Sequence, residues 1–436
     1  MIVMKFGGTS LGTAESIQNV FRIVKDRVDE NPVLVVSAHA GVTNALVALG
    51  KGAPHGDIDL AGIIDGHREL LAGLELPADL LDAQFEEMTD LVRGMKLVSE
   101  ASPRALDLLL SFGERCSSRV IAAFFNARGL QAVAVNSYEA GLRTDGTFGR
   151  ARPLPDDGRI AKYLAAVDGI PVVTGFLGID DKGNITTLGR NGSDFSAALI
   201  GNALGAEEIQ IWTDVDGVMT ADPRLVEGTR PIPTMSFGEA SELAYYGGKV
   251  LHPATIQPAM QKSIPVRVLN THRPDSPGTV ILPEYEEKEA PVRAIVHKDG
   301  IYLINLVSPP MLAQHGFLAK VFTAAERHEI DVDLVATSEV SITMTTDRAD
   351  NLPGFCEELS TLGDVSVEEN HALLCVVGQG MAHFPGVAAR VLVTLNDADV
   401  RVRVISRGAI KVNIGLVIDQ ADLKTAVRAL HTEFFG

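Results

Sequence analysis

Short apolar runs alternate with helical patterns over roughly the first 285 residues of the chain. Runs of four or five mainly apolar residues, typical of buried strands, occur at residues 2–6, 33–37, 132–135, 171–174, 209–213 and 266–269. Apolar positions at helical spacing occupy residues 14–28 and continue again from residue 41. Strands that alternate with helices predict an open, mostly parallel α/β sheet with helices on both faces. Ligands of such sheets bind beyond the carboxyl ends of the strands.

The pattern changes after residues 282–291, a charged segment that contains prolines and is typical of a linker. Apolar runs over 292–307, a helical pattern over 316–328 and a strand pattern over 332–345 come next. A similar order recurs at 372–377, 386–397, 400–406 and 411–418. The repetition predicts two small α+β modules, residues 292–367 and 368–436, after a domain that spans residues 1–285. Interleaving of the modules in space would blur the boundary near residue 368.

The composition fits a globular chain of two or three domains, with 436 residues of which 46% are hydrophobic and 22% charged. The net charge of -18 argues against nucleic acid or a membrane surface as a partner, because both are polyanionic. An anionic substrate would therefore need local cations. Cys116, Cys356 and Cys375 are far apart and lack metal-ligand spacing, so neither a disulfide framework nor a zinc site is predicted.

The first residues do not resemble a secretion signal, because the apolar stretch 2–4 is short and Lys5 interrupts it. No stretch reaches the roughly 18 apolar residues that a transmembrane helix needs. We therefore expect a cytoplasmic protein.

Lys5 lies near the end of the first predicted strand and precedes Gly7, Gly8, Thr9 and Ser10. A lysine within a buried strand is costly unless its charge is used. Glycines let backbone N–H groups approach a phosphate, and the N-terminus of the following helix favours anions. The alternative is an ordinary strand–turn–helix corner whose lysine reaches solvent, and this segment alone does not separate the two. The sequence contains no GxxxxGK[ST] motif, so a P-loop nucleotide site is not predicted.

Six segments together resemble the aspartate kinases, members of the amino-acid kinase fold, and they occur in the order that this family shows. They are residues 5–10 (Lys-Phe-Gly-Gly-Thr-Ser), 37–44 (Ser-Ala-His-Ala-Gly-Val-Thr-Asn), 111–115 (Ser-Phe-Gly-Glu-Arg), 187–194 (Thr-Leu-Gly-Arg-Asn-Gly-Ser-Asp), 212–217 with 222–224 (Trp-Thr-Asp-Val-Asp-Gly and Asp-Pro-Arg) and 248–253 (Gly-Lys-Val-Leu-His-Pro). The resemblance covers essentially the whole chain. It implies phosphorylation of the side-chain carboxylate of L-aspartate by ATP, the first step towards lysine, threonine and methionine.

The resemblance assigns the phosphate side of this reaction mainly to lysines. A free aspartate side chain has a pKa of about 3.9, so it is already an ionised nucleophile at neutral pH and needs no general base. The site must instead supply positioning and positive charge. Lys5 and Lys249 would neutralise the phosphoryl group, although Lys249 also suits a solvated helix end. The ATP-binding residues implied are Lys5, Gly7, Gly8, Thr9, Ser10, Thr213, Asp214, Asp216, Gly217, Arg224 and Lys249.

The resemblance also implies four residues for aspartate. Arg190 would bind the α-carboxylate, Glu114 and Asp194 the ammonium, and Thr43 would donate a hydrogen bond. Together with the two lysines, Arg190 and Asp194 form the expected catalytic set. Glu114 has the alternative of an ion pair with Arg115, and Asp194 that of capping a helix.

Mg²⁺ is expected to accompany ATP, although no metal-binding motif occurs and no metal site made by the protein alone is predicted. Two positions depart from the family pattern. Met219 stands where the family often has Tyr beside the adenine, and Asn191 stands where many relatives have Gly.

The second half resembles the paired ACT modules of these kinases, which are ferredoxin-type α+β modules, and it is most similar to the lysine-responsive branch. The effector residues implied are Met311, Gly316, Phe317, Val332, Asp333, Ser338 and Glu339. Asp333 and Glu339 suit a cationic amino acid, so lysine is the expected effector and threonine the alternative. The apolar members could equally be core and the acids surface residues. Pairing of ACT modules implies a homodimer or higher homo-oligomer, although residues 406–413 depart from the family pattern.

Two other functions fit parts of the sequence. One is an amino-acid kinase that acts on glutamate or a nucleotide, which the Ser-Phe-Gly-Glu segment and the paired modules disfavour. The other is an amino-acid sensor with a degenerate kinase domain. The presence of Lys5, Glu114, Arg190, Asp194 and Lys249 disfavours that alternative.

Overall fold

The computed structural model describes residues 1–248, 253–285, 290–408 and 412–436. These residues form two compact units. The first unit contains residues 1–218, 233–237 and 253–283. The second contains residues 219–232, 238–248, 284–285, 290–408 and 412–436.

The first unit is built on an eight-stranded sheet of described residues. Its order is β3 (Ala132–Val135), β4 (Ile170–Thr174), β2 (Pro32–Val36), β1 (Ile2–Phe6), β7 (Glu208–Thr213), β9 (Val266–Asn270), β10 (Thr279–Leu282) and β8 (Thr234–Ser236). All neighbours from β3 to β9 are parallel, whereas β10 is antiparallel to β9. The mostly parallel sheet is thus confirmed, and all six predicted strands are present.

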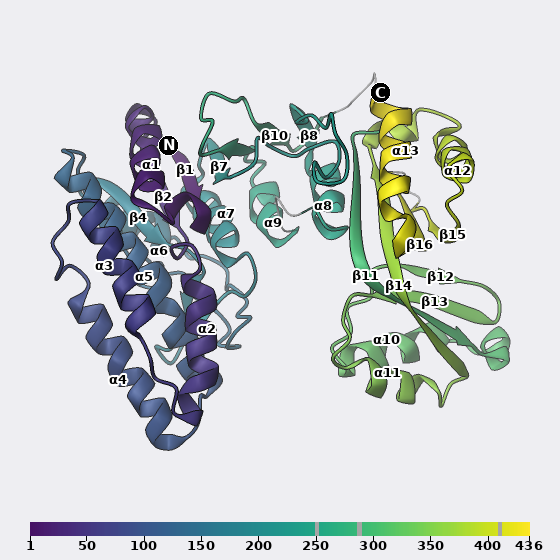
Figure 1. The fold of residues 1–436 in the computed structure, drawn as a ribbon, viewed down its shortest axis with the longest axis horizontal. Coiled ribbons are helices and arrows are strands. Elements are labelled where there is room, and N and C mark those ends of the chain that lie inside the picture. Colours follow the sequence, from purple (N-terminus) through teal and green to yellow (C-terminus); the bar gives the residue numbers. More distant parts are fainter. Residues whose placement is uncertain (249–252, 286–289, 409–411) are drawn as a thin grey trace. The chain divides into compact units, whose positions relative to one another are not determined.

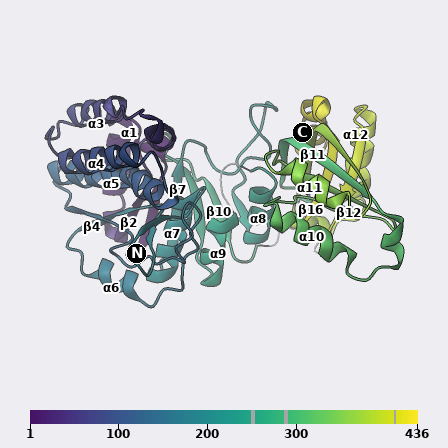
Figure 2. The same cartoon turned by 90° about the horizontal axis from the view of Figure 1, so that it is seen from below.

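Helices cover both faces of this sheet, as predicted (Figures 1 and 2). One face carries α1 (Ala14–Lys25), α2 (Val42–Gly52), α3 (Ala61–Gly73), α4 (Asp82–Val98) and α5 (Pro103–Ala127). On the other face, α7 (Gly192–Leu204) packs against β1 and contacts α6 (Arg159–Ala165) and α9 (Pro253–Gln261). A short hairpin of β5 (Leu177–Ile179) and β6 (Ile185–Thr187) connects β4 to α7.

The two-residue period of β1 decides which side chains meet which helices. Ile2, Met4 and Phe6 belong to the core on the side of α1 to α5. Val3 faces α7, where a Cβ on Gly201 would lie 3.8 Å from its Cγ2 atom. Lys5 must therefore also point towards α7.

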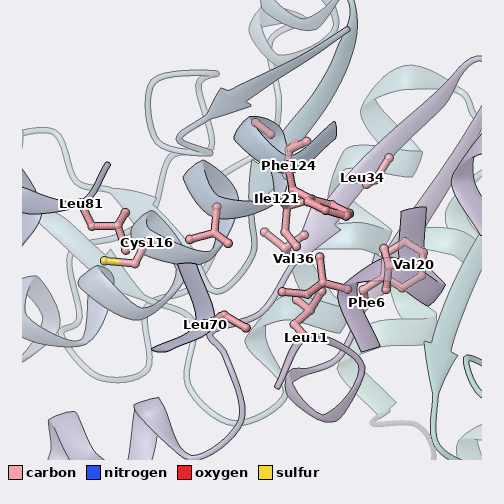
Figure 3. Close-up of a cluster of buried hydrophobic side chains, with 14 of the residues drawn as sticks. Phe6, Leu11, Val20, Leu34, Val36, Leu70, Leu81, Cys116, Ile121 and Phe124 are labelled. Carbon is pink, nitrogen blue, oxygen red and sulfur yellow. The ribbon is translucent and has the colours of Figure 1, made fainter. Parts of the chain in front are cut away.

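The core on the α1–α5 side is a continuous cluster of buried side chains. Figure 3 shows side chains of β1, β2, α1, α3 and α5 meeting in it, among them Phe6, Leu34, Val36, Val20, Leu70, Ile121 and Phe124. Burying each large apolar side chain stabilises the fold by about 1.5–3 kcal/mol. Cys116 is part of this core, and burial raises the pKa of its thiol to about 12, so it behaves as an apolar residue.

The second unit contains a six-stranded antiparallel sheet. Its order is β12 (Val335–Thr337), β13 (Ser341–Thr346), β11 (Ala294–Val307), β14 (Asp364–Val377), β16 (Asn413–Asp419) and β15 (Val402–Ser406). Its helices are α10 (Phe317–Arg327), α11 (Leu352–Leu359), α12 (Val387–Asp397) and α13 (Leu423–Phe435). The chain passes from the first unit to the second after residue 218, again within α8 (Phe237–Tyr245), and again after residue 283.

Two separate cores share the long strands β11 and β14. Ile304 of β11 packs in a core with α10 and α11, whereas Ile295 of the same strand packs with α12 and α13. The core beside α12 and α13 also contains Ala221 and Val226, which precede the predicted boundary at residue 285. Both cores therefore use strands of the same sheet. The functional division of the chain at residues 285 and 368 stays a prediction.

No helix in the described parts of the chain combines the length and the apolar character needed to cross a membrane.

Gly113 should be essential for the packing of α5, because a Cβ there would lie 2.7 Å from Cβ of Ala38. We expect Gly113→Ala to lower the free energy of unfolding by about 1–3 kcal/mol through overpacking. Gly94 of α4 is the matched control, because a Cβ there meets no described atom within 4 Å. We expect Gly94→Ala to raise the free energy of unfolding by up to about 1 kcal/mol. Urea unfolding curves measure the free energy of unfolding of both variants. Equal changes in the two variants would contradict the packing argument.

Candidate active site

The carboxyl ends of the parallel strands lie at one edge of the first unit's sheet, and most predicted site residues follow those ends. Gly7 and Gly8 follow β1, the loop before Thr43 follows β2, and Asp214 follows β7. This is the edge at which a doubly wound sheet binds ligands.

Lys5 forms a buried ion pair with Asp194 of α7. Its Nζ atom lies 2.5 Å from Oδ1 of Asp194, and the two side chains are only 10% and 12% exposed. In the sheet, Lys5 is flanked by Val35 of β2 and Ile211 of β7. Removing one member of such a pair would leave an uncompensated buried charge. The ammonium is therefore held in the interior and does not simply reach solvent.

Asp194 is not the capping residue of α7. The helix N-cap is Asn191, which has a φ angle of 54°, and Asp194 lies in the first turn. A carboxylate there is stabilised by the helix dipole. Asparagine tolerates this left-handed conformation better than most residues. Asn191 can therefore adopt the conformation that the start of α7 requires.

The glycines after β1 lie close to the ion pair and to the loop after β2. A Cβ on Gly7 would lie 3.5 Å from Nζ of Lys5, and one on Gly8 would lie 3.0 Å from the carbonyl oxygen of Ala38. Thr9 is exposed, whereas the hydroxyl of Ser10 is buried against the hydroxyl of Thr271, at 2.7 Å. Of the two predicted hydroxyls, Thr9 is thus the accessible one, and Ser10 ties this segment to the end of β9.

Glu114 projects from α5 towards the loop after β2. Its Oε1 atom accepts a hydrogen bond from the backbone N–H of Ala38, at 3.1 Å. Its Oε2 atom is buried and has no hydrogen-bond partner among the described residues. Burial raises the pKa of Glu114 to about 8, against the lowering effect of the Ala38 hydrogen bond. Arg115 pairs instead with Glu87 of α4, at 2.5 Å, so the alternative of a Glu114–Arg115 pair is not seen.

The other two predicted aspartate ligands lie on turns. Thr43 is half-buried in the first turn of α2, which begins after Gly41 with a φ angle of 80°. Arg190 is exposed on the turn between β6 and α7. It is flanked by Gly189 and Asn191, both with positive φ.

The turn after β7 is held by residues of and after β9. The carboxylate of Asp216 accepts a hydrogen bond from Asn270, at 2.7 Å, and pairs with Arg273. Gly217 has a φ angle of 134°, and a Cβ there would overlap the hydroxyl of Thr279. Asp216 and Gly217 thus shape this turn.

Asp214 is exposed on the same turn and accepts a hydrogen bond from the hydroxyl of Thr213, at 3.2 Å. Asp214 is therefore the accessible carboxylate beyond β7.

One predicted nucleotide residue lies in the second unit and another lies outside the described residues. Arg224 belongs to the second unit, where its guanidinium pairs with Asp222 at 2.5 Å. Met219 is also in the second unit. Lys249 lies outside the described residues.

His39 is a structural residue at this edge that was not predicted. It is buried in the loop after β2, and its Nδ1 atom lies 2.7 Å from the carbonyl oxygen of Leu11. Burial and the neighbouring His67 lower the pKa of His39 to about 3, so a neutral ring donates Nδ1–H to that carbonyl. His39 therefore joins the loops after β1 and β2. The sequence places it within the 37–44 segment but does not reveal its partner.

In the second unit, six of the seven predicted effector residues divide into two groups. Phe317, Met311 and Val332 pack in or against the core beside α10 and α11, and Gly316 is the N-cap of α10. Ser338 and Glu339 are exposed on the turn between β12 and β13.

Asp333 is largely buried and pairs with an ammonium that was not predicted. Nζ of Lys298 lies 2.9 Å from Asp333 and 2.9 Å from Asp347. Burial raises the pKa of Asp333, although Lys298 opposes this. The second carboxylate oxygen of Asp333, Oδ2, is buried without a hydrogen-bond partner among the described residues. The hydroxyl of Tyr245 donates to the adjacent carbonyl of Val332, at 3.0 Å.

The sheet, with its lysine and glycines at the carboxyl edge, has the architecture of the amino acid kinases. The model of the amino acid kinase family matches residues 1–270, and an ACT domain model matches residues 374–434. Chloroplast aspartokinase 1 of Arabidopsis thaliana is 37% identical over 460 residues, which cover 99% of this chain and 80% of that protein. Lysine-sensitive aspartokinase 3 of Escherichia coli is 36% identical over 457 residues, covering 100% of this chain and 99% of that protein.

The solved structures agree with these relatives. Escherichia coli aspartokinase III in complex with aspartate and ADP, in its R-state, superimposes with a TM-score of 0.87 at 35% identity, with full coverage of both chains. The same enzyme in complex with lysine and aspartate, in its T-state, gives a TM-score of 0.79. The chain therefore belongs to the aspartokinases, the ATP-dependent kinases of the amino acid kinase family that act on aspartate.

Proposed function

We propose that this chain converts ATP and L-aspartate to ADP and 4-phospho-L-aspartate at the carboxyl edge of the first sheet. Lys5, Lys249, Arg190 and Asp194 would form the catalytic set, within a catalytic domain of residues 1–285. The observation that carries the proposal is the buried Lys5–Asp194 pair beside Gly7. The product would enter the synthesis of lysine, threonine and methionine.

The chemistry requires charge and alignment more than proton transfer. The β-carboxylate of aspartate is ionised at neutral pH and attacks the γ-phosphorus of ATP while the bond to the ADP oxygen breaks. Lys5 would offset the negative charge that gathers on the transferred phosphoryl group, and Lys249 would share this task. Asp194 would hold the Lys5 ammonium in place, because its own position is fixed in the first turn of α7.

The amino-acid end of the substrate would be held by two kinds of contact. Arg190 would bind the α-carboxylate through two parallel hydrogen bonds. The α-ammonium would contact the buried Oε2 atom of Glu114, which has no hydrogen-bond partner among the described residues. Asp194 would be the second carboxylate beside the α-ammonium. Thr43, in the first turn of α2, would donate one further hydrogen bond. Recognition of both charged groups would select a free amino acid.

ATP would be bound by the backbone of Gly7, Gly8 and Thr9 and by the turn after β7. The remaining nucleotide contacts proposed are Ser10, Thr213, Asp214, Asp216, Gly217, Arg224 and Lys249, of which Ser10 and Asp216 would act by shaping the backbone. Mg²⁺ would accompany ATP, held chiefly by phosphate oxygens and water. Asp214 fits such an ion, because its carboxylate is exposed just beyond β7. No group of three or more metal-ligating side chains occurs in the described ranges.

We propose that the second unit carries two ACT modules, residues 292–367 and 368–436, that bind lysine as a feedback inhibitor. The effector contacts would be Met311, Gly316, Phe317, Val332, Asp333, Ser338 and Glu339. Asp333 supports a cationic effector, because its buried carboxylate already accepts one ammonium, that of Lys298. The lysine-sensitive relative supports lysine in particular. We also propose a homodimer and a cytoplasmic location.

Trapping of the acyl phosphate with hydroxylamine tests the proposed reaction. Protein, ATP and Mg²⁺ should give hydroxamate with aspartate, and none with glutamate or without an acceptor. Lys5→Ala should lower kcat by at least about 100-fold, because charge stabilisation at the phosphoryl group is lost. Lys51→Ala, at an exposed position of α2, is the control and should leave kcat unchanged. A product that does not depend on aspartate would refute the proposed function, and normal turnover by Lys5→Ala would refute the role of Lys5.

Binding of aspartate should release a proton, because the pKa of Glu114 is raised to about 8. Glu114 is mostly protonated at pH 7 in the free protein, and the substrate ammonium favours its ionised form. The affinity for aspartate should therefore rise about tenfold per pH unit below pH 8 and level off above it. Calorimetric titrations in buffers of different ionisation enthalpy measure the proton release. Glu114→Gln should abolish it, Glu87→Gln should retain it, and release by both variants would exclude Glu114 as the source.

Lysine should inhibit the enzyme through Asp333. We expect Asp333→Asn to raise the lysine concentration for half inhibition at least about tenfold, since a charge-assisted hydrogen bond contributes about 1.5–3 kcal/mol. Asp331→Asn is the matched control, because Asp331 is exposed and pairs with Arg348. Equal inhibition of wild type and Asp333→Asn would remove Asp333 from the effector site. Inhibition by threonine alone would identify the other effector.

A further inference from the structure

Helix α5 carries a second buried carboxylate that the proposed reaction does not use. Asp107 lies seven residues before Glu114, so two helical turns place both on one face of α5, about 10 Å apart. Glu114 reaches the loop after β2, whereas Asp107 reaches the hairpin before α7. Asp107 is almost fully buried, with 1% of the residue exposed.

Three donors from two segments converge on the Asp107 carboxylate. The backbone N–H of Gly149 donates to Oδ1 and Oδ2, at 3.0 and 2.9 Å. Thr187 donates its backbone N–H to Oδ2 at 2.8 Å and its hydroxyl to Oδ1 at 2.9 Å. One carboxylate thus fixes the end of β6 and the loop that crosses it.

These anchored segments form the base of the turn that carries Arg190. Thr187 is the last residue of β6, and its carbonyl accepts a hydrogen bond from Ala151 at 2.8 Å. Two residues further, a Cβ on Gly189 would lie 3.3 Å from the carbonyl oxygen of Gly149. Both residues that Asp107 binds therefore support the backbone immediately before Arg190.

The position of Arg190 depends on this backbone. Arg190 is exposed, so packing of its side chain cannot set its place. On the other side of the turn, Asn191 begins α7, whose Asp194 is fixed by Lys5. The turn is thus held by one buried carboxylate at each end. A bidentate contact with a carboxylate requires the guanidinium to be placed within about 0.5 Å.

We propose that Asp107 is a positioning residue for the aspartokinase reaction, which places Arg190 for the α-carboxylate of aspartate through Thr187 and Gly149. The inference rests on the proposed function, since it requires that Arg190 binds that carboxylate. Burial also raises the pKa of Asp107, and the hydrogen bonds from Gly149 and Thr187 oppose this, so they help to keep the group ionised.

The variant Asp107→Asn tests the proposal, because it keeps the shape and replaces one acceptor oxygen by an NH₂ group that faces a backbone N–H. We expect the KM for aspartate to rise at least tenfold, with kcat within about twofold and the KM for ATP unchanged. Asp180→Asn is the matched control. Asp180 accepts hydrogen bonds from Lys182 and Asn184 at the opposite end of the same hairpin. This control should leave the KM for aspartate unchanged.

A double-mutant cycle with Arg190→Ala separates positioning from a general structural effect. If Asp107 acts through Arg190, Asp107→Asn should add no further rise in KM to Arg190→Ala. β-Alanine, which has the reacting carboxylate and the ammonium but no α-carboxylate, gives a second readout. Both single variants should lose most of the wild-type preference for aspartate over β-alanine.

Each outcome of the cycle bears on a different claim. A normal KM for aspartate in Arg190→Ala would refute the proposed role of Arg190 and this inference with it. A raised KM in Arg190→Ala together with a normal KM in Asp107→Asn, or fully additive effects, would overturn the inference alone. Thr187→Val serves if Asp107→Asn does not fold, because it removes only the hydroxyl donor. Its KM for aspartate should rise about threefold, and an unchanged value would also overturn the inference.

Discussion

The ion pair of Lys5 and Asp194 is the interaction on which the organisation of the site depends. It joins the central strand of the sheet to the first turn of α7, and both charges are removed from water. Neither charge could be buried alone, so each fixes the position of the other. The glycines after β1 and the turn before α7 are thereby held at the same edge of the sheet. A buried ammonium is kept in this way at that edge, within a chain of net charge -18.

Buried polar groups elsewhere at this edge connect the loops to one another. His39 joins the loops after β1 and β2, Ser10 joins the first of these to the end of β9, and Glu114 holds the backbone of Ala38. In each case, a side chain of one segment forms a hydrogen bond with a buried polar group of another segment. The backbone positions of the loops at this edge therefore depend on side chains that are distant in the sequence.

The local features of the site could be predicted from the sequence, whereas the partners of each residue could not. The apolar runs predicted six strands at nearly their observed limits, because burial on both faces of a parallel strand leaves a continuous pattern. The partners of Lys5, His39 and Asp107 lie between 28 and 189 residues away, and no local pattern reveals such distances. The sharing of β11 by two cores could not be predicted either, because its two halves pack against helices that lie in different parts of the sequence.

Because both cores use β11 and β14, the second unit cannot be divided into two fragments that each keep a complete core. Each strand is 14 residues long. The two halves of β11 enter different cores, whereas β14 contributes mainly to the core beside α12 and α13 and only Val365 to the other. Neither core has a complete sheet of its own, so a chain cut between the modules would leave two fragments with exposed apolar edges. The modules therefore have to unfold together, and an evolutionary loss of one of them would require a new strand in the other.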